Sequence, residues 1–422
     1  MSEPEPTALW LPDEVLFNIL STLQDSDDPD AISTKEANIT LFNACLASRR
    51  LESLAQRVLY RCIDARSSKC LLTLGQNPHL CRLVRELYCP YDEEVVNALL
   101  HPHFRNYIWL PSSWSASFPN WLESEHGRQE YYGQATAFWV QRLPNLNRLT
   151  ISLSYDMKAL TEMVQKSLNG QPRRFPRLTR IDFKLCPGGI PPCIQPSLIL
   201  FQLPFLKTVT IHDMPFFAKS SSGDLEMPKN ACKRLERLDA DFAWITPGSL
   251  RNLLSVCESL RFLDIKASRR WTNGLTGGRE VQEQTWAANN IGSLQNLTRL
   301  KRFSLSVELR HLTVPGPSVP PPSPSKLDFE LMLPTSIEQF EIRKIGIPDY
   351  KAFVRNIREL LQSKRLTNLF QVSVAAHLKP HHVTHPSWEV QLHGPGQIDK
   401  VLQLVHKDRK GTIQSSRYDQ EA

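Results

Sequence analysis

The sequence lacks the long apolar runs that a membrane-spanning helix needs. No apolar stretch approaches the roughly 18 residues of such a helix, and the longest candidate, PSLILFQLPFL at 196–206, is interrupted by proline. The first residues are acidic, whereas a secretory signal begins with Lys or Arg ahead of an apolar core. We therefore expect a cytoplasmic or nuclear protein with no membrane segment.

The sequence also lacks a dense cysteine framework and the short motifs of common enzymes. Its nine cysteines are scattered, and no two of them have the spacing of a zinc knuckle. We interpret them as reduced, mostly buried thiols. GxxxxGK[ST], HExxH and GxSxG are all absent from the sequence. These absences predict a non-catalytic protein that needs no cofactor.

Metal-ligating side chains gather in one place, the histidine-rich run at 377–386. His377, His381, His382 and His385 could meet on one side of a regular helix. Two prolines within the run disfavour that helix, however. We interpret the run as a solvated loop and predict no metal site.

Positive charge is missing from residues 1–30, which hold eight acids. Because the net charge of the whole chain is +7, residues 31–422 carry +15. A basic body can attract acidic peptides, phosphorylated partners or nucleic acid over long range. The basic residues are dispersed among acids without the stripe that a nucleic-acid surface needs, which argues against nucleic acid.

The stretch LWLPDEVLFNILSTL at 9–23 has the pattern of a helix start. Pro12 suits a first helical turn, Asp13 and Glu14 lie near the positive end of the helix dipole, and apolar residues follow at spacings of three and four. ITLFNACLASRRLESLAQRVLYRCI at 39–63 adds two helical pieces. Three such pieces in about fifty residues cannot bury all their apolar faces. Part of this surface should therefore meet another domain or protein.

Together these two stretches resemble an F-box over residues 9–63. The shared features are leucine-proline, two acids, an amphipathic helix, a helix ending in Ser-Arg-Arg and a closing LAQ…LY, while the connection at 24–38 is longer and more acidic than the family pattern. The resemblance implies docking to a Skp-type adaptor and, through it, to a cullin. The alternative is that the helices only cap a protein-interaction scaffold. The implied adaptor contacts are Leu11, Pro12, Leu16, Ile19, Leu20, Leu41, Cys45 and Leu46.

From Leu143 onward the phrase Leu-x-x-Leu-x-Ile, or a near equivalent, recurs at steps of 25 to 40 residues. Its alternating apolar residues indicate half-buried strands, and helical stretches lie between several of them. Stacking such strand–helix pairs gives a continuous core. We predict fold class α/β: a helical F-box, then an irregular leucine-rich-repeat solenoid with a parallel sheet on its concave face and helices on its convex face. The phrases begin at 146, 178, 206, 235, 260, 300, 337 and 369.

This order of elements resembles the F-box substrate receptors of fungi. The resemblance implies a subunit of a cullin-type (SCF) ubiquitin ligase that binds an unknown protein substrate through its repeats. The predicted parts are an acidic tail (1–8), the F-box (9–63), a linker with a first degenerate strand and an aromatic-rich insertion (64–142), the solenoid (143–408) with a proline-rich loop (314–325) and a last strand and helix within 388–406, and a disordered tail (409–422).

The outward positions of the predicted strands form two columns, the first of which has four acids and no base. We expect a strip around Asp239, Asp241 and Asp264 to bind a polar or basic peptide. The alternatives are an ordinary solvated face and, because the body is basic, an acidic ligand bound elsewhere. The candidate substrate contacts are Asp182, Lys184, His212, Asp239, Asp241, Asp264 and Lys266.

Overall fold

The computed structural model divides into two units, Met1–Ile151 with Asn169–Leu178, and Ser152–Leu168 with Thr179–Ala422. Each unit is described by itself. The predictions for 1–8, 314–325 and 409–422 lie outside the described residues. The described residues are 11–23, 34–89, 91, 93–99, 125–153, 158–168, 177–185, 195–216, 227–228, 230–245, 247–267, 293–307, 329–343, 350–374, 385–393 and 401–408.

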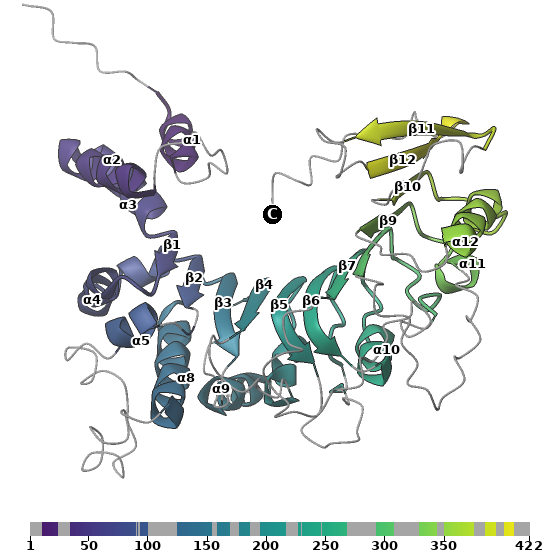
Figure 1. The fold of residues 1–422 in the computed structure, drawn as a ribbon. Coiled ribbons are helices and arrows are strands. Elements are labelled where there is room, and N and C mark those ends of the chain that lie inside the picture. Colours follow the sequence, from purple (N-terminus) through teal and green to yellow (C-terminus); the bar gives the residue numbers. More distant parts are fainter. Residues whose placement is uncertain are drawn as a thin grey trace, which may run out of the picture. The chain divides into compact units, whose positions relative to one another are not determined.

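Unit 1 begins with the three predicted helical pieces (Figure 1). Two acids occupy the first turn of the first helix, where they face the positive end of its dipole. Ser48 caps the third helix, because its hydroxyl accepts the backbone N–H of Leu51 at 3.2 Å. The helices are α1 (Asp13–Thr22), α2 (Thr34–Ala47) and α3 (Arg49–Leu59).

These three helices share one small apolar core. Leu20 of α1, Leu41 of α2 and Leu54, Ala55 and Val58 of α3 are buried in a single cluster. Full burial of a leucine side chain contributes about 1.5–3 kcal/mol, so these contacts account for much of the packing of the three helices.

The remainder of unit 1 continues as strands and helices. The strand predicted within 79–89 is β2, but β1 precedes it, so residues after 63 start with a strand and a helix rather than a linker. Three residues are too few to show an alternating pattern, which is why β1 was missed. Strands β1, β2 and β3 pair in parallel. The elements are β1 (Cys62–Asp64), α4 (Ser68–Gln76), η1 (Leu80–Arg82), β2 (Glu86–Cys89), α5 (Glu93–Leu99), α8 (Glu125–Arg142) and β3 (Arg148–Leu153).

The aromatic-rich insertion ends in α8, whose tyrosines are buried. The hydroxyl of Tyr131 donates to the carbonyl of Leu99 at 2.9 Å, and that of Tyr132 donates to the carbonyl of Cys89. Each buried hydroxyl thereby finds a partner, as a buried polar group must. The aromatic residues of this helix therefore serve packing in unit 1.

Unit 2 is an open, mostly parallel sheet. Every predicted repeat phrase, including the one that forms β3, has a strand that starts at its third residue. Strand order follows the chain from β4 to β10, and β12 and β11 then add antiparallel. The strands are β4 (Arg180–Leu185), β5 (Thr208–Phe216), β6 (Arg237–Ile245), β7 (Phe262–Ala267), β8 (Arg302–Val307), β9 (Gln339–Arg343), β10 (Gln371–Val374), β11 (Trp388–His393) and β12 (Val401–His406).

Helices of unit 2 pack on the apolar face of its sheet (Figure 1). The rings of Phe303 and Phe340, from neighbouring strands, stack with centroids 5.6 Å apart. Phe329 of α11 lies 5.3 Å from Phe340 and 6.3 Å from Phe353 of α12. The core of unit 2 therefore lies between sheet and helices. The helices are α9 (Lys158–Leu168), η3 (Gln195–Gln202), α10 (Pro247–Ser255), α11 (Phe329–Met332) and α12 (Tyr350–Gln362).

One element differs from its prediction. The segment 396–406 was expected to end in a helix, but 401–406 is strand β12, which pairs with both β10 and β11. Leu402, Leu404 and Val405 are buried and Gln403 is half-buried. The pairing of 401–406 with both β10 and β11 makes it a strand, so the helix prediction was wrong. None of the helices in the described residues has the length and apolar character needed to cross a bilayer.

Two leucines of α2 give a matched test of the helical core. Leu41 is fully buried, whereas Leu46, on the same helix, is 71% exposed. We expect Leu41→Ala to lower the free energy of unfolding of the helices by about 2–5 kcal/mol, because it leaves a cavity. Leu46→Ala should change it by less than about 0.5 kcal/mol. Urea titration followed by circular dichroism measures both, and equal losses would contradict the described core.

Candidate functional site

The start of α1 is tied to the start of α3 by one arginine. Arg50 donates from Nε to the carboxylate of Asp13 at 2.7 Å and from Nη2 to the carbonyl of Leu11 at 2.5 Å. The guanidinium of Arg57 lies 4.7 Å from the ring centre of Phe17, a second link between these helices. The Leu11-Pro12 turn and the Ser-Arg-Arg stretch, which the sequence pattern names separately, are therefore in contact.

Large apolar side chains are exposed along α1 and α2. Ile19 is 51% exposed, Phe42 is 56% exposed and Leu46 is 71% exposed. The α1 members are four residues apart and the α2 members three and four apart, so each set lies along one face of its helix. Among the described residues, the other exposed large hydrophobic side chain is Phe205 of unit 2. We call these side chains the apolar rows: Val15 and Ile19 on α1, and Ile39, Phe42 and Leu46 on α2.

The eight predicted adaptor contacts fall into three groups. Pro12, Ile19 and Leu46 are exposed, and Leu11, Leu16 and Cys45 are half-buried. Leu20 and Leu41 are buried in the helices' own core, so they hold the helices together and offer no surface to a partner. The predicted contacts leave out three members of the apolar rows: Val15, Ile39 and Phe42.

The second surface is the polar face of the sheet in unit 2, opposite the helices. Its parallel strands are in register, so equivalent positions of successive strands lie side by side. The predicted first outward column is therefore a physical row, and we call it the acid row. Across unit 2 it contains Asp182, Thr210, Asp239, Asp264, Ser304, Glu341 and Ser373.

Next to the acid row lies a row with three arginines, which the predicted columns leave out. It occupies the position two residues earlier on each strand, which points to the same face. We call it the arginine row. Its members in unit 2 are Arg180, Thr208, Arg237, Phe262, Arg302, Gln339 and Gln371.

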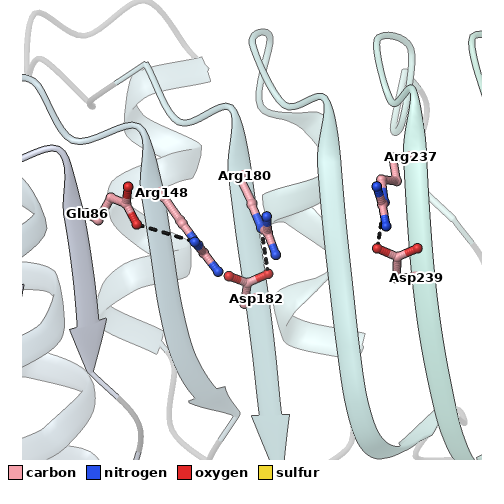
Figure 2. A network of polar contacts seen from close by, with 6 residues as sticks. All are labelled: Glu86, Arg148, Arg180, Asp182, Arg237 and Asp239. Carbon is pink, nitrogen blue, oxygen red and sulfur yellow. Dashed lines mark hydrogen bonds and ion pairs between the residues drawn. The ribbon is translucent and has the colours of Figure 1, made fainter. Parts of the chain in front are cut away.

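Arginines of this row hold the carboxylates of the acid row (Figure 2). Arg180 donates to Asp182 at 3.0 Å and Arg237 donates to Asp239 at 2.7 Å, each within one strand. Arg302 reaches across to Glu341 at 3.4 Å, and Asp264 pairs with Lys266 at 3.6 Å. In unit 1, Arg148 of β3 likewise pairs with Glu86 of β2 at 3.3 Å.

The two rows differ in depth. The side chain of Asp239 is 21% exposed and that of Arg237 is 42% exposed, and Glu341 and Arg302 differ in the same way. Asp182 is buried. A buried carboxylate needs a paired cation, and the arginines meet that need while their outer N–H groups face solvent. The outermost charges of this face are therefore positive.

The acidic strip predicted to bind a basic peptide is paired with bases of its own face, and peptide binding there stays a prediction. All four acids of the acid row already hold a base of the same face. Of the other predicted contacts, Lys184 and Asp241 are half-buried and His212 is exposed. Asp241 is the register partner of Lys266, so the central acids and bases alternate rather than segregate. The signal that could have shown this is the Arg-x-Asp spacing in β4 and β6.

The described residues hold no cluster of His, Cys, Asp and Glu that could bind a metal ion. His385 is described, but His377, His381 and His382 lie outside the described residues. Burial raises the pKa of the Cys70 thiol to about 11. A hydrogen bond with Cys232, together with burial, raises the pKa of Cys257 well above its usual value. These two thiols are therefore poor nucleophiles at neutral pH.

Comparisons with protein-family models and with curated proteins find no match for this chain.

The raised thiol pKa values predict selective alkylation. Cys62 is exposed, whereas Cys257 is buried and Cys70 is half-buried with a raised pKa. Because the thiolate is the reacting form, iodoacetamide at pH 7.5 should modify Cys62 at least about tenfold faster than Cys70 or Cys257. Peptide mass spectrometry measures each rate, and the unfolded chain in guanidinium, where the three rates should converge, is the control. Equal rates in the native protein would contradict the described burial.

Proposed function

We propose that this chain is an F-box protein: the substrate-receptor subunit of a cullin-type ubiquitin ligase, with a leucine-rich-repeat solenoid as its receptor part. The observation that carries the proposal is the exposure of the apolar rows on α1 and α2. Soluble proteins seldom leave several large apolar side chains exposed together unless a partner covers them. A Skp-type adaptor is the partner implied by the F-box resemblance of residues 9–63.

Docking has a defined geometry in this proposal. The apolar rows supply the buried contact, and fully burying each side chain contributes about 1.5–3 kcal/mol. Arg50 links the Leu11-Pro12 turn to the start of α3. Leu20 and Leu41 act from within, by keeping the helices packed. A preorganised surface binds more tightly because less ordering accompanies binding.

The proposed mechanism is proximity. The receptor holds a protein substrate on its repeats while the adaptor and cullin bring a ubiquitin-charged enzyme alongside. Holding two reactants together raises their effective concentration, so the receptor needs no active site. The raised thiol pKa values of Cys70 and Cys257 agree with a non-catalytic role for these two cysteines.

A second candidate function is a repeat scaffold with no ligase role. It is favoured by the buried cluster around Leu41, because three helices that pack on one another are also what a simple cap would contain. The two candidates differ in one respect. A cap has no use for the apolar rows, whereas an adaptor interface depends on them.

Adaptor binding distinguishes the two candidates. The purified full chain is titrated with a recombinant Skp-type adaptor, and affinity is measured by calorimetry for the natural sequence and for Phe42→Glu with Leu46→Glu. We expect the double variant to bind at least about a hundredfold more weakly, because two carboxylates would be buried without partners.

Phe205→Glu is the matched control, since Phe205 is also exposed but belongs to unit 2. It should leave adaptor affinity unchanged. Circular dichroism should report the same helical content for all three proteins. If the natural chain shows no adaptor binding, or if the control loses as much affinity as the double variant, the ligase proposal fails and the scaffold stands.

A further inference from the structure

Three neighbouring strands place an aromatic ring between two arginines on the polar face of unit 2. Arg237 of β6 is the register partner of Phe262 of β7, which is the register partner of Arg302 of β8. Adjacent strands are about 4.8 Å apart, so the outer two backbones of the three lie about 10 Å apart with the ring between them. We call these residues the Arg–Phe–Arg triplet.

Phe262 is the aromatic member of the arginine row. In β4 and β6 the residue two positions before the aspartate is arginine, but in β7 the residue two positions before Asp264 is Phe262. Phe262 is half-buried rather than buried, so part of the ring faces outward. An apolar group on a charged face has no role in the core, which lies on the other side of the sheet.

Both arginines keep donors for a partner. A guanidinium has five N–H groups. Arg237 uses Nε toward Asp239, and its Nη groups extend beyond this bond. Arg302 uses Nη2 toward Glu341. Each guanidinium is bonded on one side to a carboxylate, Arg237 at 2.7 Å and Arg302 at 3.4 Å, which reduces its side-chain freedom before a partner binds.

We propose that the Arg–Phe–Arg triplet binds an anionic segment of a protein substrate, with carboxylate or phosphate groups on Arg237 and Arg302 and an apolar side chain on Phe262. The proposal rests on the proposed function only in taking the occupant to be the ligase substrate. The exposure of the two arginines carries it: Arg237 and Arg302 are 42% and 41% exposed, whereas the carboxylates that they pair with are 21% and 19% exposed. A basic segment is disfavoured, because the acids beneath are already paired.

Peptide pools of defined charge test the proposal on the full chain. Each pool holds fluorescein-labelled peptides of about twelve residues, in which two phenylalanines and two serines are fixed. Four further positions distinguish three pools, being all Glu, all Gln or all Lys. The remaining positions are random. A fourth pool is the Gln pool with both serines phosphorylated. Fluorescence anisotropy gives the affinity of each pool.

We expect the Glu pool, the phosphoserine pool or both to bind at least about tenfold more tightly than the Gln pool, and the Lys pool to bind most weakly. Binding of the Glu pool identifies carboxylates as sufficient, and binding of the phosphoserine pool alone identifies phosphate as required. Equal binding of all pools, a preference for Lys, or tighter binding of a single-stranded oligonucleotide than of any peptide pool would overturn the proposal.

Variants then locate the site. Arg237→Gln with Arg302→Gln should weaken binding of the preferred pool about tenfold or more, and Phe262→Ala should weaken it several-fold with its preference for anions retained. Arg355→Gln, at an exposed position on α12, is the matched control and should change nothing. If the double variant is unfolded by circular dichroism, Arg302→Lys replaces it: loss of the planar fork at constant charge should still weaken binding. Unchanged binding in the folded variants would overturn the proposal.

Failure here is separable from failure of the ligase role. The triplet variants should bind the Skp-type adaptor as the natural chain does, because the apolar rows are untouched. Anionic peptides that bind a chain unable to capture the adaptor would leave this site standing and remove the ligase. A chain that captures the adaptor but binds no peptide pool would leave the ligase proposal standing and remove this site.

Discussion

In-register parallel pairing is the constraint from which the structure of unit 2 follows. When each repeat adds a strand in the same register, every position of the repeat becomes a row across the sheet. On one face the rows are leucine, isoleucine and phenylalanine, and they are buried beneath the helices. On the other face most rows are polar. A charged residue on one strand lies on a backbone about 4.8 Å from that of the equivalent residue on the next strand. Asp239 and Asp264 are direct neighbours in the acid row and would repel, and each is paired with a base of the same face.

A different constraint acts on the helices at the start of unit 1. Three helices of 10, 14 and 11 residues cannot enclose all their apolar side chains. Leu20 and Leu41 occupy the shared core, which leaves Ile19, Phe42 and Leu46 outside it. Exposed apolar rows on two small helices are therefore a consequence of size, and selection for a partner can keep them apolar. A third constraint is the link of Arg50 to Asp13 and to the carbonyl of Leu11, which ties the start of α1 to the start of α3.

Much of this could be predicted from the sequence, because the repeat phrase is periodic and the period-two alternation within it is local. The strands and three of the helices between them follow from that pattern alone. Strand β1 was missed because three residues show no period, and β12 was taken for a helix because its pairing with β10 depends on distant residues. For the helices, the sequence indicates an apolar stripe but does not show which of its residues are buried in the helices' own core and which are exposed. Whether Leu41 or Leu46 faces inward depends on how α2 rotates against α3.

The arginine row was left out of the prediction for a related reason. The prediction used two columns of outward residues and left out the outward position two residues before the first column. Arg180 occupies that position in β4, two residues before Asp182. The acids of one column alone predict an acidic strip. The charge that a binding partner contacts, however, depends on which side chains of the face are the more exposed. Asp182 is buried and Asp239 is mostly covered, while Arg237 and Arg302 extend outward from the carboxylates they pair with. A face with balanced charges can therefore present a cationic outer layer. Phe262, between Arg237 and Arg302 in the register of the sheet, places an aromatic ring in that layer.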